Sequence, residues 1–274
     1  MRNERMRNVR FTICCLLVLL SSCEKEIDID YRTIEPRYVA EVEVRPGMAK
    51  ARLTTTRAIE NSRVEDTYVT NATVTVSMVP DGKSYQLKYT GRGFYEAKVA
   101  GIEGQEYLAD IEIDGQHYTS TSTMLSAPVI NSFTLVWQDI VGERMLFGDL
   151  RLQDNPTEHN YYFMHLYRNG IGYRWAVMRD TSNPGDELQQ LFSCTTEEEI
   201  RKNDSDELRE GDRLRLEVRS IDKLAYDYLY SLQTMDNSGS NPIQNFTGGM
   251  LGYFSAYQSQ TCETVFHIDS VQTR

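Results

Sequence analysis

Short segments in which apolar and polar residues alternate dominate the first half of the chain, and they constrain the fold more than any other feature. The segment YVAEVEV at residues 38–44 is one example. A period of two places successive side chains on opposite faces of a β-strand. The predicted strands are residues 38–44, 51–57, 72–79, 84–90, 94–99, 107–113 and 117–122. Turn sequences such as Asp114-Gly115 separate them, so we predict an immunoglobulin-like β-sandwich over residues 37–126.

The second half remains rich in predicted strands but contains one helix. The strands are expected at residues 129–137, 145–152, 161–168, 171–178, 213–219, 250–257 and 264–268. From residue 221 to 235 the apolar spacing becomes helical, with one stripe formed by Ile221, Leu224, Ala225, Tyr228, Leu229, Leu232 and Met235. Pro128 disfavours a continuing strand and marks the boundary. We therefore predict a mostly β chain whose second domain, residues 127–274, is β-rich α+β with one covering helix at 221–235.

Residues 1–22 have the pattern of a signal peptide. Four arginines precede an apolar stretch at residues 11–20, which is shorter than the ~20 residues that a membrane-spanning helix needs. The sequence Leu20-Ser21-Ser22-Cys23 resembles the bacterial lipobox, in which the cysteine thiol is acylated and becomes the first residue of the mature chain. The alternative is an ordinary cut after Cys23, with Ser21 and Cys23 as the two small residues.

Acidic residues follow Cys23 at every second position, at Glu24, Glu26, Asp28 and Asp30. We interpret residues 23–36 as a solvated acidic tether; the alternative is a metal site. Acids directly after a lipoprotein cysteine also resemble the surface-export signal of Bacteroidota lipoproteins. Because each buried acyl methylene contributes ~0.8 kcal/mol, two or three chains on Cys23 would anchor the protein. The resemblance to this export signal implies an outer-membrane location with possible exposure at the cell surface.

The charge of the chain excludes one class of partner. Four arginines and one glutamate lie in residues 1–22, so the remaining chain has 25 basic and 39 acidic residues and a net charge of −14. Nucleic acid needs a basic surface, and it is therefore not an expected partner. The four histidines, His117, His159, His165 and His267, lack metal-ligand spacing. No metal or cofactor is predicted.

Two cysteines remain in the expected mature chain besides Cys23. Cys194 and Cys262 form an even pair, as in proteins of oxidising compartments. A disulfide between them would stabilise the fold by ~4 kcal/mol in the chain-entropy model. Two buried thiols are the alternative, and the sequence leaves both open.

The residues predicted to bind a partner or ligand lie on the helix and in the loop after it. Tyr226 and Tyr230 are i, i+4 neighbours that we place on the polar side of the helix. Asn241 and Asn245 belong to a long loop that contains glycine, and long loops often carry function. The alternative for the tyrosines is surface decoration.

A second group of aromatic residues falls on two predicted strands. Tyr161, Phe163, His165 and Tyr167 share one strand face, and Tyr173, Trp175 and Val177 share another. An exposed platform of this kind could stack on sugar rings or peptide side chains. The alternative is that these side chains form the core of a sandwich.

Several segments of the chain resemble one family. They are AEVEVRPG, NATVTV, NYYFMHLYRNG, GDRLRLEVRSIDKLAYDYLYSL and NPIQNFTGGMLGYFSAY, and the most specific part spans residues 211–257. Together they resemble the Bacteroidota outer-membrane lipoproteins grouped as domain of unknown function 4249. The resemblance implies a gene beside a TonB-dependent transporter and a role in nutrient capture. It implies no catalytic residue, because the family has no assigned chemistry.

Three functional hypotheses follow from these patterns. The first is a non-enzymatic binding lipoprotein that presents an oligosaccharide or peptide to a TonB-dependent transporter. The second is a structural or assembly partner of that transporter without a ligand of its own. The third is a hydrolase, which is disfavoured because the acidic residues are dispersed along the sequence.

Overall fold

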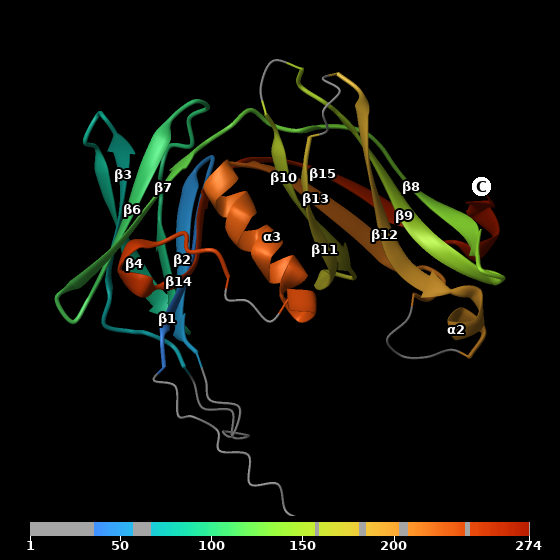
Figure 1. Cartoon of the computed structure of the whole chain (residues 1–274), viewed down its shortest axis with the longest axis horizontal. Helices are drawn as coiled ribbons and strands as arrows, with labels where there is room; N and C mark the ends of the chain where they lie inside the picture. Colours follow the sequence, from blue (N-terminus) through green and yellow to red (C-terminus); the bar gives the residue numbers. More distant parts are fainter. Residues whose placement is uncertain are drawn as a thin grey trace, which may run out of the picture. The chain divides into compact units, whose positions relative to one another are not determined.

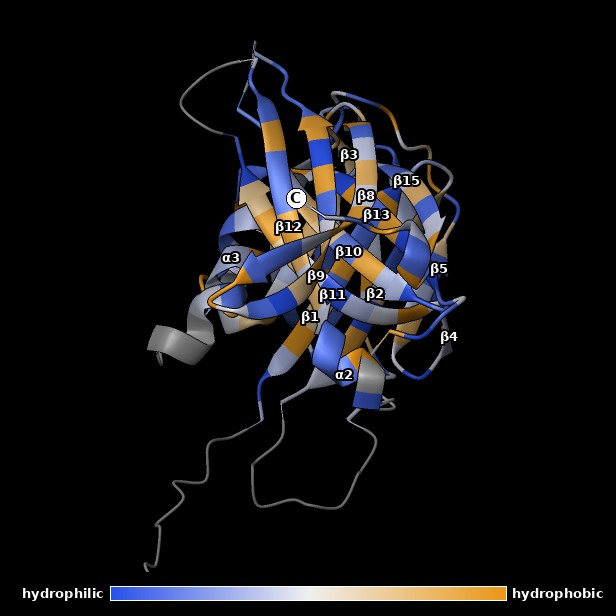
Figure 2. Ribbon diagram, turned by 90° about the vertical axis from the view of Figure 1, so that its right-hand side faces the viewer, coloured by the Kyte–Doolittle hydropathy of each residue, from blue (hydrophilic) through white to orange (hydrophobic). Residues whose placement is uncertain are grey.

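The computed structural model describes residues 36–56, 67–156, 159–180, 185–202, 208–238 and 242–273, and Pro36–Arg274 forms one compact unit. The predicted signal peptide, Cys23 and all but the last residue of the tether lie outside the described residues. The chain is mostly β, as predicted. Hydrophilic and hydrophobic residues alternate along many strands (Figure 2), which is the pattern that the sequence analysis relies on.

The first β unit is an eight-stranded sheet that folds over its own core. Its strands are β1 (Tyr38–Arg45), β2 (Met48–Thr55), β3 (Thr73–Val79), β4 (Ser84–Gly91), β5 (Phe94–Ala97), β6 (Glu106–Ile113), β7 (Gln116–Thr123) and β14 (Leu251–Ala256). Their order is β14-β1-β2-β5-β4-β3-β6-β7. The first half of β4 pairs with β3 and its second half with β5. This change of partner folds the sheet into a sandwich-like arrangement.

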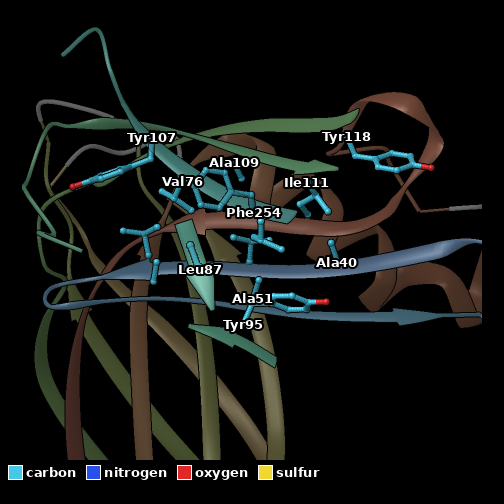
Figure 3. Packing of buried hydrophobic residues seen from close by; sticks show 14 of the residues in the cluster. Ala40, Ala51, Val76, Leu87, Tyr95, Tyr107, Ala109, Ile111, Tyr118 and Phe254 are labelled. Carbon is cyan, nitrogen blue, oxygen red and sulfur yellow. The ribbon is translucent and has the colours of Figure 1, made fainter. Parts of the chain in front are cut away.

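The core of the first β unit contains side chains from both layers. Ala40 and Ala51 come from β1 and β2, Ile111 comes from β6, and Phe254 comes from β14 (Figure 3). All four are fully buried. The strands predicted from residue 38 to residue 122 are therefore confirmed as strands, with ends that shift by up to three residues.

Strand β14 is the main departure from the predicted division into two domains. Residues 250–257 are predicted to belong to the second domain, but β14 pairs in parallel with β1, from Val39 opposite Leu251 to Val44 opposite Ala256. A boundary at residue 126 therefore separates β14 from the sheet that it completes. Alternation predicts that a strand exists, but it does not identify a pairing partner about 200 residues away in the chain.

The second β unit consists of two four-stranded sheets that face each other. The sheets are β11-β10-β13-β15 and β12-β9-β8-β16. The strands are β8 (Val129–Ile140), β9 (Glu143–Gln153), β10 (Tyr161–Arg168), β11 (Ile171–Arg179), β12 (Glu187–Thr196), β13 (Arg213–Ile221), β15 (Gln258–Val265) and β16 (Gln272–Thr273). Apolar side chains from both sheets, including Leu150 and Leu216, form one core.

The sequence patterns did not predict β12, the short helix α2 (Glu197–Lys202), β16 or the first six of the eight residues of β15. In β12 a register shift between Ser193 and Thr195 interrupts the alternation. Strand β15 lies at the edge of its sheet and is mostly polar and exposed. Hydrophobic periodicity is weak in both cases, for these two different reasons.

Helix α3 (Lys223–Ser238) confirms the predicted helix and packs against β10, β11 and β14 (Figure 1). Ile221 remains on β13, and the helix begins after Asp222, which accepts a hydrogen bond from the Ala225 N–H at 2.9 Å. The buried face is rotated from the predicted stripe, because Leu224 is 47% exposed and Tyr226 only 7%. The helix packs against aromatic residues of two sheets rather than against one apolar surface.

Gly252 permits the parallel pairing of β14 with β1. Its φ is +105°, and a Cβ atom there would lie 1.8 Å from the carbonyl oxygen of Ala40. Both the conformation and the close approach require glycine.

We predict that Gly252→Ala lowers the free energy of unfolding by about 3 kcal/mol, measured by urea denaturation. Gly115→Ala is the matched control, because Gly115 has a φ of +80° and a Cβ atom added there would meet no other atom within 4 Å. The control substitution should lower the free energy of unfolding by only about 1 kcal/mol. Equal losses for the two variants would show that contact with Ala40 is unimportant.

Candidate functional site

One face of the sheet β11-β10-β13-β15 carries aromatic and charged side chains. His165 on β10 lies opposite Trp175 on β11 and Glu217 on β13, and Tyr167 lies opposite Arg215. We call these five residues the aromatic face. Neighbouring residues such as Met164 and Leu166 point to the other side of the sheet, into the core of the second β unit.

The rings of the aromatic face support one another. His165 and Tyr167 stack with their centroids 4.1 Å apart, and the Arg215 guanidinium lies 4.1 Å from the centroid of Tyr167. Phe163, which is buried, contacts both His165 and Trp175 with centroid distances of 6.0 and 6.1 Å. Trp175 is 42% exposed. The face is therefore a fixed set of rings that is partly open to solvent.

A buried guanidinium joins this face to the first β unit. Arg219 on β13 contacts Glu43 of β1 at 2.7 Å and Glu217 at 3.1 Å. The same group lies over the ring of Tyr257, with its Cζ 4.4 Å from the centroid. Burial by itself lowers the pKa of Arg219, but Glu43, Tyr257 and Glu217 outweigh it and hold the pKa above its ordinary value. Arg219 therefore remains charged.

For His165, unlike Arg219, the surroundings favour the neutral form. Burial and the neighbouring Arg219 lower its pKa below the ordinary value, so the ring is neutral at pH 7. Gly172 on β11 lies beside it, and a Cβ atom at that position would be 2.8 Å from His165 Nε2. The missing side chain leaves room for the edge of the imidazole.

The structure contradicts the expectation that Tyr226 is exposed. Its ring packs between Tyr161, at a centroid distance of 4.9 Å, and Tyr230, at 5.5 Å. Of Tyr226 and Tyr230, only Tyr230 is exposed to solvent, at 46%. Because α3 packs against two β units, its buried surface is wider than a single stripe, and this surface includes Tyr226.

Asn245 links two strands of the first β unit. Its Oδ1 accepts hydrogen bonds from the Phe254 N–H at 2.9 Å and from the Ser120 hydroxyl at 2.7 Å. These contacts bridge β14 and β7, the two ends of the eight-stranded sheet. Asn241, predicted with it, lies outside the described residues.

A second polar bridge also joins β14 to β7, and it reaches α3. The Ala256 N–H donates to Ser122 Oγ at 2.7 Å, and the Ser122 hydroxyl donates to the carboxylate of Asp222. Asp222 also caps the N-terminus of α3. Burial raises the pKa of this carboxyl, although its hydrogen bonds, first among them the one from Ser122, oppose the rise.

The thiols of Cys194 and Cys262 are not joined by a disulfide in the structure. Cys194 belongs to the core of the second β unit, and Cys262 packs against it. Burial raises the pKa of Cys262 to about 11, so this thiol is protonated at neutral pH and is a poor nucleophile.

Within the described residues, no cluster of three or more His, Cys, Asp or Glu side chains could hold a metal ion. In the same part of the chain, no helix is long and apolar enough to cross a membrane. A surface pocket of about 310 Å³ adjoins the start of β1, and it is lined by Pro36, Arg37, Tyr38, Gln116, Tyr118, Gly248, Gly249 and Met250.

The alternating pattern predicts the rings of the aromatic face, but its charged members were not predicted. Arg215, Glu217 and Arg219 alternate with apolar residues on β13, which is a detectable signal. What the pattern cannot provide is the order of the strands, and that order places β13 beside β10.

Asp222→Asn tests the polar bridge between β7, β14 and α3 through the pH dependence of stability. Because burial raises the folded-state pKa above the unfolded value of ~3.9, protonation favours the folded state. The stabilising contribution of Asp222 is therefore full below the unfolded pKa and falls as pH rises through the folded pKa. We expect Asp222→Asn to cost more stability at pH 4 than at pH 7.5, measured by thermal unfolding. The control is Asp139→Asn, which removes an exposed carboxylate; an equal cost at both pH values would contradict the prediction.

Comparison with known proteins gives one match, to a family model. No curated protein matches the chain. The family model named domain of unknown function 4249 matches residues 24–263, which include both β units up to β15. This match confirms the predicted family, and the chain belongs to the family of domain of unknown function 4249.

Proposed function

We propose that this chain is a lipid-anchored, non-enzymatic binding protein of the outer membrane of a Bacteroidota. In this proposal it is an accessory component of a TonB-dependent nutrient-uptake system. The observation that carries the binding function is the aromatic face, a rigid and partly open set of rings beside paired charges.

The composition of the aromatic face supports a role in binding. Trp, Tyr and Arg are the side chains that most often dominate binding energy at interfaces. Here Trp175, Tyr167 and Arg215 lie on adjacent strands, and their neighbours Phe163 and Arg219 are held in place by buried contacts. A face fixed before the ligand arrives loses little conformational entropy on binding.

The carboxylates at this face support binding over hydrolysis. A glycosidase of the common type uses two carboxyl groups on either side of the scissile bond, one of them as an acid. Glu43 and Glu217 instead contact the Arg219 guanidinium. Both carboxylates act as counter-ions of a buried arginine, which is a structural use.

The sequence around Cys23 supports the anchor. The Leu-Ser-Ser-Cys motif and the acidic residues after it lead into β1, which begins at Tyr38. The aromatic face belongs to the second β unit. In the sequence, strands β1 to β7 of the first β unit therefore lie between Cys23 and the aromatic face.

We predict that Cys23→Ala abolishes lipidation, because only the thiol can form the thioether to diacylglycerol. Labelling of cells with a radioactive fatty acid should mark the wild-type protein and leave the variant unlabelled. Label on the variant, or a wild-type chain with a free Glu24 amino terminus, would contradict the anchor.

The binding function is tested in cells that lack the chromosomal copy of the gene. The double variant Tyr167→Ala/Trp175→Ala should be lipidated and folded, yet nutrient-dependent growth should fall to the level of the deletion strain. Tyr89→Ala is the matched control, because Tyr89 is an exposed tyrosine of the first β unit. Wild-type growth of the double variant would contradict the proposal. Loss of growth in Tyr230→Ala alone would instead place the site on α3.

A further inference from the structure

We infer that the ligand of the aromatic face is a neutral oligosaccharide. This inference rests on the proposed binding function and specifies the chemical class of the ligand. Three properties of the face lead to it: the spacing of its rings, the pairing of its charges and the occupation of the neighbouring strand edge.

The rings are spaced to contact more than one sugar. Trp175 lies directly across from His165, and Tyr167 follows His165 by two residues on the same side of β10. Diagonal neighbours of this kind have their Cα atoms ~7–8 Å apart. A pyranose ring presents a flat face of C–H groups, which packs against an aromatic ring because the ring face is electron-rich. One sugar can lie on Trp175 and the next on the stacked His165–Tyr167 pair.

Hydrogen-bonding groups lie beside these rings. Arg215 Nη1 is 3.9 Å from Glu217 Oε2, and Glu217 is the cross-strand neighbour of His165. Glu263 on β15 lies opposite Arg215. Guanidinium groups donate hydrogen bonds in a planar fork and carboxylates only accept them. This alternation of donors and acceptors matches the hydroxyl groups of a sugar, which both donate and accept.

The charges on the face select a neutral ligand. The positive charges of Arg215 and Arg219 are paired with the negative charges of Glu217 and Glu43 at 2.7–3.9 Å. The exposed carboxylate of Glu263, opposite Arg215, adds a further negative charge, which disfavours an anionic ligand. A charged ligand would have to disrupt one of these partly buried pairs, which is costly. The chain as a whole has a net charge of −11, which further disfavours a polyanion.

The β11 edge of the sheet is poorly arranged for a peptide strand. Peptides that extend a sheet need unpaired backbone groups along an edge strand. On β11, the edge beside the aromatic face, the Val177 N–H donates to Gln233 Oε1 of α3 at 2.9 Å. Arg174 reaches the Ser193 carbonyl of β12 at 2.9 Å, so β12 lies beside the same edge. At the β11 edge, these contacts favour a ligand that lies on the face over one that extends the sheet.

The test uses the lipidated full-length protein in detergent. It is screened against an array of neutral glycans, acidic glycans and peptides, and any ligand found is measured by calorimetry. We expect a neutral oligosaccharide to bind, with affinity reduced at least tenfold in Trp175→Leu and Tyr167→Ala. Trp175→Phe, which keeps an aromatic ring, should retain most of the affinity, and the control Tyr89→Ala should bind like the wild type.

Intrinsic fluorescence gives a second readout. The chain has two tryptophans, and Trp137 is buried whereas Trp175 is exposed on the face. Addition of the oligosaccharide should change the emission of the wild type and leave that of Trp175→Phe unchanged.

The possible failures are distinguishable. Binding only to acidic glycans, only to peptides, or to nothing on the array would overturn the inference, and so would equal affinities for Trp175→Leu and Trp175→Phe. If the double variant still fails in cells, the proposed function stands without its sugar ligand. If a neutral oligosaccharide binds but the double variant grows like the wild type, the proposed function fails instead.

Discussion

The parallel pairing of β14 with β1 is the constraint on which the rest of the structure depends. It brings a strand at residues 251–256 into a sheet whose other members lie between residues 38 and 123. Immediately after it, the chain passes through Tyr257 into β15, which belongs to the second β unit. The Tyr257 N–H donates to the Val44 carbonyl at 2.9 Å and extends the pairing by one residue. A single continuous segment is therefore part of both β units.

Polar contacts specify how the two β units meet. Arg219 of β13 reaches Glu43 of β1, and Asp222 at the start of α3 reaches Ser122 of β7. Ion pairs that are largely buried contribute little net stability, because desolvation offsets the attraction between the charges. Removing one partner of such an ion pair is nevertheless costly, because it leaves the other charge buried and unpaired. We therefore interpret these contacts as fixing the position of β13 and α3, and with them the aromatic face that we propose as the binding site.

Local patterns predict local elements well. The hairpin around Asp114-Gly115 and the one around Asn169-Gly170 have their turn residues at positive φ, as the dipeptides indicate. Helix α3 is evident from its spacing, and the rings of β10 are evident from the period of two. The outcome for Tyr226 differs because a helix that packs between two β units buries more than the stripe that points toward one sheet.

What the sequence leaves undetermined depends on long-range pairing. Neither the parallel partner of β14 nor the position of β13 beside β10 follows from periodicity, so Arg215, Glu217 and Arg219 could not be placed with His165 and Tyr167. The bulge in β12 and the polar edge strand β15 weaken the very signal that identifies strands. The rings of the candidate site are therefore predictable from the sequence, whereas its charges and its connection to the first β unit require the fold.

Because the continuous segment from β14 to β15 is part of both β units, we expect the two units to unfold together. Hydrogen exchange of residues 36–274, followed by mass spectrometry at increasing urea concentrations, tests this claim peptide by peptide. We expect the peptides of β1, β6 and β14 to lose protection at the same urea concentration as those of β10 and β13. Loss of protection in β1 and β6 at a clearly different concentration, with β10 and β13 still protected, would show two independent domains and contradict the account.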